Sequence, residues 1–311
     1  MDKINKGVVF SNDIKLILKG KNSLKYSFKN NGIIIPDDSF IDNLREEFKK
    51  IVKKAYGTDI TIVNENDMKA YMNSYIDKFN SYPIVSMDDI YVKCDYREVY
   101  PLDCTRLSGT NKMISRLNPL DPNGVKKQII ELSNIFKKQG TKEIILLDDV
   151  IYSGSVIKYI SDLFLKEGIT VIGAIAGISS EEGYEMYSKL PLKVNCGLLM
   201  SKDVIDEICE RDFYYGIPQS GMAVIIDGKV YKSPYVLPFG DPVARASVPE
   251  ENSGYLSNEC IGLGLELWKE TQRLSGREIM NYELPERILN TDYNEGVVKT
   301  LKKVLKWKKY K

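Results

Sequence analysis

Residues 124 to 177 alternate between helical and strand patterns, and this alternation limits the possible folds more than any other feature of the sequence. Apolar residues recur at helical spacing over 124–139 and again over 156–168, and a glycine ends each segment. Residues 144–147 and 169–176 are mainly apolar runs, typical of strands buried on both faces. Short connections between such elements predict a parallel sheet with right-handed crossovers, and therefore an α/β fold.

The rest of the chain predicts additions on both sides of this core. Residues 1–36 have the pattern of short strands and turns. Further helices are expected at 37–57, 67–79, 257–275 and 296–309, strands at 60–63, 89–92 and 99–102, and a hairpin at 224–230. We therefore predict a core with its N-terminal extension over 1–200 and a C-terminal hood or cap over 201–311, packed as one globule.

The composition excludes several classes of chemistry. The chain of 311 residues has no histidine, which rules out Ser-His-Asp and Cys-His catalysis and histidine-ligated zinc. Its 44 Lys and Arg nearly balance 43 Asp and Glu, so no overall positive charge attracts nucleic acid. The sequence has no secretory signal pattern and no apolar run of the roughly 18 residues that a membrane span needs. The cysteines are scattered and odd in number: Cys94, Cys104, Cys196, Cys209 and Cys260. We expect a soluble, cytoplasmic protein without membrane contact, and a homo-oligomer remains open.

The segment from Ile144 to Ser155 carries the candidate chemistry. Asp148 and Asp149 follow a buried strand, at the edge where open α/β sheets bind ligands. The turn Ser153-Gly154-Ser155 then opens a helix, whose first N–H groups favour a phosphate. Carboxylates that accept sugar hydroxyls beside a phosphate-binding turn match a sugar phosphate. The alternative is that the two acids only cap the helix, but two carboxylates ending an apolar strand are costly without a partner, so we favour the ligand site.

The same segment resembles the PRPP (phosphoribosyl pyrophosphate) signature of type I phosphoribosyltransferases: four apolar residues, two acids, two apolar residues and a hydroxyl-Gly-hydroxyl loop. The resemblance implies that Asp148 and Asp149 hold the ribose hydroxyls. It also implies that Tyr152, Ser153, Gly154 and Ser155 bind the 5′-phosphate and that Mg²⁺ lies on the diphosphate and ribose oxygens, with Asp148 and Asp149 as further ligands.

Two positions depart from the family pattern. Val156 stands where members commonly have a last Thr or Ser, so one phosphate hydrogen bond is expected to be missing. Tyr152 stands where the 6-oxopurine branch has an aspartate that acts on the base, which disfavours hypoxanthine and guanine as substrates.

Two further parts of the family's site have weaker candidates. The pyrophosphate loop is assigned to residues 101–109, with Thr105, Arg106, Ser108 and Gly109 as donors, although a surface loop with an exposed arginine fits equally well. Aromatic residues in 215–221 and 234–242 could stack a base, or could simply form the core of a small subdomain. The pair Asp88-Asp89 is expected to be solvated.

Three functions are compatible with these residues. The first is a phosphoribosyltransferase that binds PRPP or a ribose-5-phosphate nucleotide with Mg²⁺ and displaces pyrophosphate from the anomeric carbon, with Asp148, Asp149 and Arg106 as catalytic residues. The second follows from a resemblance to the divergent phosphoribosyltransferase-like effectors of retrons and other phage-defence cassettes, which implies an antiviral toxin acting on nucleotides or nucleic acid. The third is a non-catalytic nucleotide sensor. Lysines on the last helix would supply a nucleic-acid contact in the second and third.

Overall fold

The computed structural model describes residues 2–19, 32–79, 81–92, 99–107, 112–188 and 193–307, and it divides into two compact units. Unit 1 comprises residues 1–6 and 64–204, and unit 2 comprises 7–63 and 205–311. Within the described ranges, no helix is both long and apolar enough to cross a membrane.

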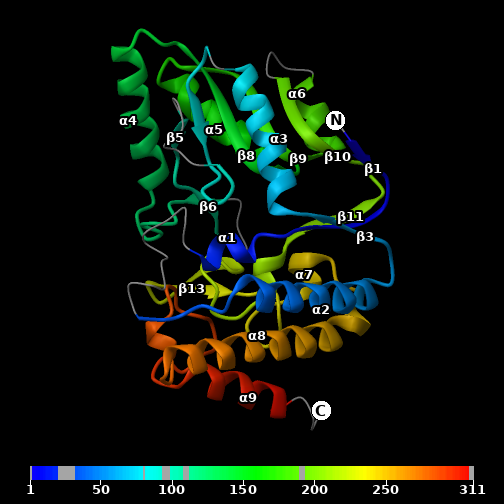
Figure 1. Ribbon diagram of the computed structural model, residues 1–311. Coiled ribbons are helices and arrows are strands. Elements are labelled where there is room, and N and C mark those ends of the chain that lie inside the picture. The colour runs from blue at the N-terminus through cyan, green and yellow to red at the C-terminus, as the bar shows by residue number, and fades with distance from the viewer. Residues whose placement is uncertain are drawn as a thin grey trace. The chain divides into compact units, whose positions relative to one another are not determined.

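Unit 1 is built on a parallel sheet of six strands in the order β1-β10-β9-β8-β4-β5, which confirms the predicted α/β class. Its strands, shown with the helices in Figure 1, are β1 (Asp2–Ile4), β4 (Ile84–Ser86), β5 (Val99–Pro101), β8 (Glu143–Ile151), β9 (Thr170–Ser180) and β10 (Lys193–Met200). A two-stranded ribbon of β6 (Thr105–Arg106) and β7 (Met113–Ile114) accompanies the sheet.

Helices cover both faces of this sheet because its central strands are apolar on both. The helices of unit 1 are α3 (Glu65–Lys78), α4 (Gly124–Lys138), α5 (Ser155–Lys166) and α6 (Glu181–Ser188). The buried stripes of α4 and α5 pack on Ile144 and Leu146 in one core, while α3 lies over β9 and β10. Met68 of α3 fills the space beside Gly177, where even a Cβ atom would lie 2.7 Å from the Met68 methyl carbon.

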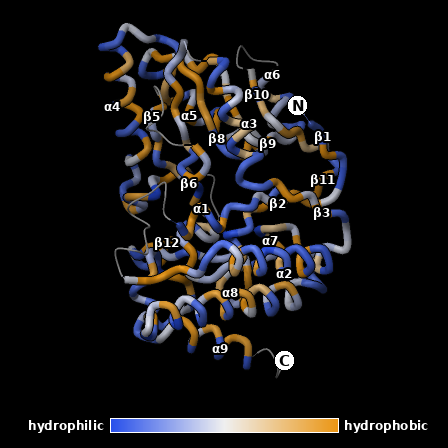
Figure 2. Tube along the Cα trace, in the orientation of Figure 1, coloured by the Kyte–Doolittle hydropathy of each residue, from blue (hydrophilic) through white to orange (hydrophobic). Residues whose placement is uncertain are grey.

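Unit 2 combines a small sheet, a hairpin and helices. The sheet has the order β11-β2-β3, formed by β2 (Gly7–Ser11), β3 (Ile60–Val63) and β11 (Val204–Cys209), and β12 (Met222–Ile226) pairs with β13 (Lys229–Ser233). The helices are α1 (Ile14–Leu18), α2 (Asp38–Tyr56), α7 (Pro242–Ala246), α8 (Ser253–Ser275) and α9 (Val297–Trp307). In Figure 2, α8 and α9 alternate between hydrophilic and hydrophobic colours, as expected for helices that bury one side.

The division into units differs from the predicted boundaries of 1–200 and 201–311. Residues 7–63 belong with the C-terminal half because β2 pairs with β11 and because α2 packs against α8. Such pairings join segments about 200 residues apart, and no local pattern in the sequence reports them. The hood or cap remains a prediction.

Two local predictions were wrong. Residues 14–18 form a short helix and not a strand, because Ile14, Ile17 and Leu18 are buried at helical spacing. Residues 89–92 form a turn and not a strand, because the Asp88 side chain accepts hydrogen bonds from the N–H groups of Ile90, Tyr91 and Val92.

The aromatic residues considered for base stacking belong to the core of unit 2. Tyr215 and Phe239 are each 1% exposed, and their ring centroids lie 4.8 Å apart.

The last helix carries less unpaired positive charge than expected, because Lys299 and Lys303 both pair with the buried Glu295. Its role in binding nucleic acid therefore stays a prediction.

Candidate functional site

The candidate site lies where the order of the parallel strands reverses. From β4 the chain moves outward to β5, then returns to the other side of β4 to form β8, β9 and β10. Ligands of open α/β sheets bind outside the carboxyl ends of the strands at such a point. The ends of β4 and β8 meet here, since Ser86 pairs with Leu147 and the Met87 N–H donates to the Leu147 carbonyl at 2.8 Å.

Asp148 and Asp149 lie within β8, which continues to Ile151, and not at its last residue as the sequence predicted. Successive side chains of a strand point to opposite faces. Asp148 therefore shares the face of Leu146, toward α4 and α5. The Asp149 carboxyl nevertheless stays within hydrogen-bonding reach of the Asp148 side chain and close to the charge of Arg116.

Burial sets the electrostatics of both acids. Burial, and next the charge of Asp149, raises the pKa of Asp148 well above its usual range, while Arg116 opposes the shift. Burial also raises the pKa of Asp149, against the hydrogen bond from the Val150 N–H and the charge of Arg116. The two carboxylates thus resist carrying full charge together without a ligand or a nearby cation.

The predicted phosphate loop has the geometry of a helix start. Gly154 adopts a left-handed conformation with φ of +71°, and α5 begins at Ser155. The Ser153 and Ser155 hydroxyls lie 3.0 Å apart, and Tyr152 is 41% exposed. The first N–H groups of the helix have no partner within it, so the loop presents donors and the positive dipole end.

Residues from β9 and α6 hold this loop in place. The Ser180 hydroxyl donates to the Tyr152 carbonyl at 2.6 Å, and the Tyr187 hydroxyl donates to the Gly154 carbonyl. Any side chain at Gly154 would meet the Tyr187 ring, because its Cβ would lie 2.4 Å from Cε2. Glycine is therefore required at position 154 for its backbone conformation and for the space.

A cavity of about 240 Å³ opens between the loop and the sheet edge. Of the predicted site residues, Thr105, Arg106, Asp148, Tyr152 and Gly154 line it. The cavity lining does not include Asp149, Ser153 or Ser155, and Ser108 and Gly109 lie outside the described residues. The remaining lining residues are Met87, Cys104, Met113, Arg116, Val150, Ile151, Val156 and Ile157.

The predicted pyrophosphate loop is part of a β-ribbon in the structure. Thr105 pairs with Ile114 and Arg106 with Met113, and both Thr105 and Arg106 reach the cavity. Arg106 is exposed, as the surface-loop alternative required, but it is also placed at the site. The two alternatives are therefore compatible.

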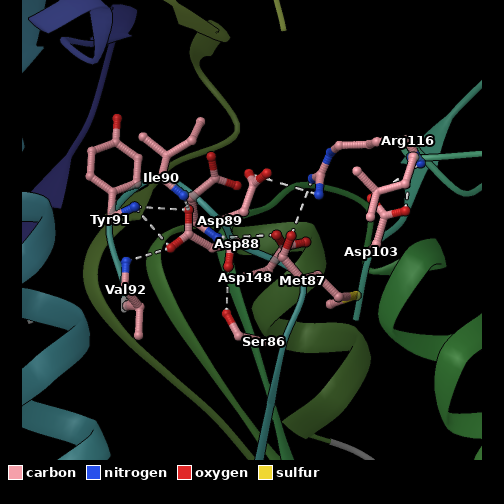
Figure 3. Close-up of polar contacts among 12 residues, drawn as sticks. Ser86, Met87, Asp88, Asp89, Ile90, Tyr91, Val92, Asp103, Arg116 and Asp148 are labelled. Carbon is pink, nitrogen blue, oxygen red and sulfur yellow. Dashed lines mark hydrogen bonds and ion pairs between the residues drawn. The ribbon is translucent and has the colours of Figure 1, made fainter. Parts of the chain in front are cut away.

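Arg116 is a site residue that the sequence analysis missed. Its guanidinium donates to the Met87 carbonyl at 3.2 Å and lies 3.8 Å from the Asp89 carboxylate. Figure 3 draws Arg116 beside these residues. Asp103 fixes the turn that carries it, accepting from the N–H groups of Arg116 at 3.2 Å and Leu117 at 2.9 Å. Burial opposes the charge of Arg116, but Asp89 and other neighbouring acids outweigh it and raise the pKa. No local pattern marked this arginine.

Asp88 is the second missed residue, and the expectation that it is solvated was wrong. It is 4% exposed, and its carboxylate accepts from the N–H groups of Ile90, Tyr91 and Val92 at 2.7 to 3.1 Å (Figure 3). Burial, and next the charge of Asp149, raises the pKa of Asp88 to about 7. A signal existed in the sequence, because Asp88-Asp89 follows the short apolar strand 84–86 much as Asp148-Asp149 follows 144–147.

The residues present fit Mg²⁺ only as an ion shared with a ligand. In the parts of the chain that the structure describes, no group of three or more Cys, Asp or Glu side chains is arranged to hold a metal ion. Mg²⁺ is commonly bound by one or two carboxylates together with substrate phosphates. Asp148 lines the cavity and could supply such a carboxylate.

The comparisons with known proteins found distant structural likeness alone. No family model matches the sequence, and no curated protein matches it. Among solved structures, the chain is similar to orotate phosphoribosyltransferase from Aeropyrum pernix, with a TM-score of 0.25 and 10% identity over 52% of this chain and 73% of that one. It is also similar to the protein TT1426 from Thermus thermophilus, with a TM-score of 0.26 and 11% identity over 42% of this chain and 82% of that one. At these scores we base the fold class on the six-stranded parallel sheet itself.

Proposed function

We propose that the cavity of unit 1 binds a phosphorylated pentose, either PRPP or a nucleotide with a ribose 5-phosphate, and that the chain displaces the group on its anomeric carbon. One observation carries the proposal: Asp148, the first turn of α5 and two arginines, Arg106 and Arg116, line the same cavity. A carboxylate accepts sugar hydroxyls, a helix start binds phosphate, and guanidinium groups bind further phosphates.

Different residues of the cavity would bind different parts of the ligand. The 5′-phosphate would lie at residues 152–155, where backbone donors and the helix dipole converge. Asp148 would fix the ribose through its hydroxyls, and the exposed Arg106 would take the diphosphate. Arg116 is held by Met87 and Asp89, so it would act mainly by stabilising the charge of Asp148.

The reaction needs positioning and charge stabilisation more than a nucleophile. As the diphosphate leaves, negative charge grows on it while the ring becomes oxocarbenium-like, and preorganised charges stabilise this state. Arg106 would stabilise the departing diphosphate, and Asp148 would hold the ring. Mg²⁺, bound through Asp148 and ligand oxygens, would supply further neutralisation of the diphosphate. Such chemistry requires no histidine.

PRPP binding and pyrophosphate release test the proposal. We expect the purified chain with Mg²⁺ to bind PRPP by calorimetry and to release pyrophosphate when bases are supplied. The variant D148N should weaken binding by about tenfold or more, because a hydrogen bond to a charged group is lost. D162N removes an exposed carboxylate of α5 that pairs with Lys158 at 2.7 Å, and it should bind as the wild type does.

The same measurements separate the other functions. No PRPP binding by the wild type, or equal binding by D148N, would overturn the proposed site. Binding without pyrophosphate release for any acceptor would favour the nucleotide sensor and contradict the transfer reaction. Growth arrest on expression that D148N relieves would favour the phage-defence effector.

A further inference from the structure

Unit 2 has a cavity of its own, of about 320 Å³, with a lining unlike that of unit 1. The lining contains aromatic rings, two cationic side chains and apolar residues, and it includes no carboxylate. Its residues are Tyr215, Lys229, Tyr231, Asn281, Leu284, Arg287, Ile288, Thr291 and Tyr293.

The hairpin and a neighbouring segment bring the cations and rings together. Lys229 and Tyr231 are two residues apart on β13, so they project from the same face of the strand. Residues 287–289 run beside β13: the Lys232 N–H donates to the Arg287 carbonyl at 2.7 Å, and the Leu289 N–H donates to the Lys232 carbonyl at 2.9 Å. This pairing places Arg287 next to the strand that carries Lys229.

The wall of the cavity is rigidly built. The Tyr215 hydroxyl donates to the Asn281 side-chain oxygen at 2.8 Å. The Asn281 side-chain nitrogen donates to the Asp292 carbonyl at 2.8 Å and to the Thr300 hydroxyl at 2.9 Å. Asn281 is 3% exposed, so a buried and hydrogen-bonded amide anchors the segment that carries Arg287 and Tyr293. A cavity with such walls exists before any ligand binds.

The charge of the cavity is not neutralised by its neighbours. Within the described residues, neither Lys229 nor Arg287 forms an ion pair, and the nearby Glu286 is paired with Lys232 at 3.5 Å. Arg287 lies over the ring of Tyr293, 4.9 Å from its centroid. Two cations beside aromatic rings attract a ligand that is both anionic and planar.

We propose that this cavity is a second ligand site, which binds a nucleoside monophosphate. Lys229 and Arg287 hold the phosphate, and the base packs against the rings of Tyr231 and Tyr293 and the apolar wall of Leu284 and Ile288. The proposal does not depend on the function proposed for unit 1, because every lining residue belongs to unit 2.

Tryptophan fluorescence of the full chain reports on this unit. Both tryptophans, Trp268 and Trp307, lie in unit 2, and the Trp268 indole donates to the Tyr215 carbonyl at 2.7 Å in the cavity wall. We expect AMP or UMP to change the fluorescence on titration, with at least tenfold tighter binding than adenosine, uridine or inorganic phosphate alone. K229Q and R287Q should each weaken binding by about tenfold, since each removes a charged partner of the phosphate.

Control variants separate the two sites. R273Q removes an exposed arginine of α8 and should bind AMP and UMP as the wild type does. D148N weakens any nucleotide binding in unit 1, so the effects of K229Q and R287Q on the fluorescence titration should persist when they are combined with D148N. Loss of the response in D148N together with wild-type binding by R287Q would overturn the second site, as would no response up to millimolar AMP and UMP. Y293L tests the base contact without a charge change. If the nucleoside monophosphates and inorganic phosphate bound with equal affinity in all variants, the cavity would bind only the anion, and the proposal of a nucleotide site would be refuted.

Discussion

Replacing Asp88 by Asn should change the stability of the chain in opposite directions at low and high pH. Two effects compete in this buried side chain. The carboxylate accepts three backbone N–H groups, and an Asn amide would turn one acceptor oxygen into a donor. Against this loss, the charged form of Asp88 is disfavoured by burial and by Asp149, which raise its pKa to about 7.

The sizes of the two effects decide whether D88N or the wild type is the more stable protein at a given pH. A lost hydrogen bond that leaves a buried donor unpaired costs about 1 to 3 kcal/mol at any pH. The raised pKa works in the other direction. Below pH 4 the carboxyl is protonated in both states and costs nothing, and as pH rises from about 4 to about 7 the unfolded state ionises first, so the free energy of unfolding falls. From an ordinary value of 3.8 to about 7, this loss reaches about 4 kcal/mol. D88N escapes it.

We therefore expect D88N to be less stable than the wild type near pH 4 and more stable above pH 7. Urea unfolding followed by circular dichroism between pH 4 and 8.5 measures both proteins under the same conditions. D203N, at an exposed position of unit 1, should follow the wild type throughout. A constant difference between D88N and the wild type over this range would refute the assignment of a raised pKa to Asp88.

Two further predictions concern single packing features. G154A should destabilise the chain by about 3 kcal/mol in urea unfolding, because its Cβ meets the Tyr187 ring at a φ of +71°. The control G168A, with a φ of +77° and open space around it, should lose only about 1 kcal/mol. Equal losses in the two variants would show that crowding by Tyr187 is unimportant. R45M should cost about 3 to 5 kcal/mol, because it removes the cation that lies 3.1 Å from a carboxylate oxygen of the fully buried Glu210, whereas R45M/E210Q should recover part of that loss. A double variant as unstable as R45M would contradict the ion-pair explanation.

The elements of the core could be predicted because their signals are local. The helix 124–139, the strand 144–147 and the helix that follows are each fixed by the spacing of their own apolar residues and by a glycine at the end. The helix start at Gly154 could be predicted for the same reason, since the residues of that turn are contiguous, and its role as a phosphate loop stays a prediction.

The missed parts depend on contacts between distant segments. Asp88 was expected in solvent because a strand was placed after it, whereas the strand lies before it and is fixed by pairing with β8, about 60 residues away. Arg116 reaches the cavity through a turn that Asp103 holds by side-chain hydrogen bonds. Neither arrangement has a periodic pattern that a sequence could display.

The two acids of the motif have different surroundings, and this changes how the resemblance applies. The resemblance implies that Asp148 and Asp149 both hold the ribose hydroxyls. Their positions differ, because Asp148 lines the cavity with Arg116, while Asp149 is not part of the lining, stays close to the Asp148 side chain and raises the pKa of Asp88. We therefore expect Asp148, and not Asp149, to contact a ligand directly. Asp149 influences the charge that the sheet edge can carry before a ligand arrives, so it acts on the site through its neighbours.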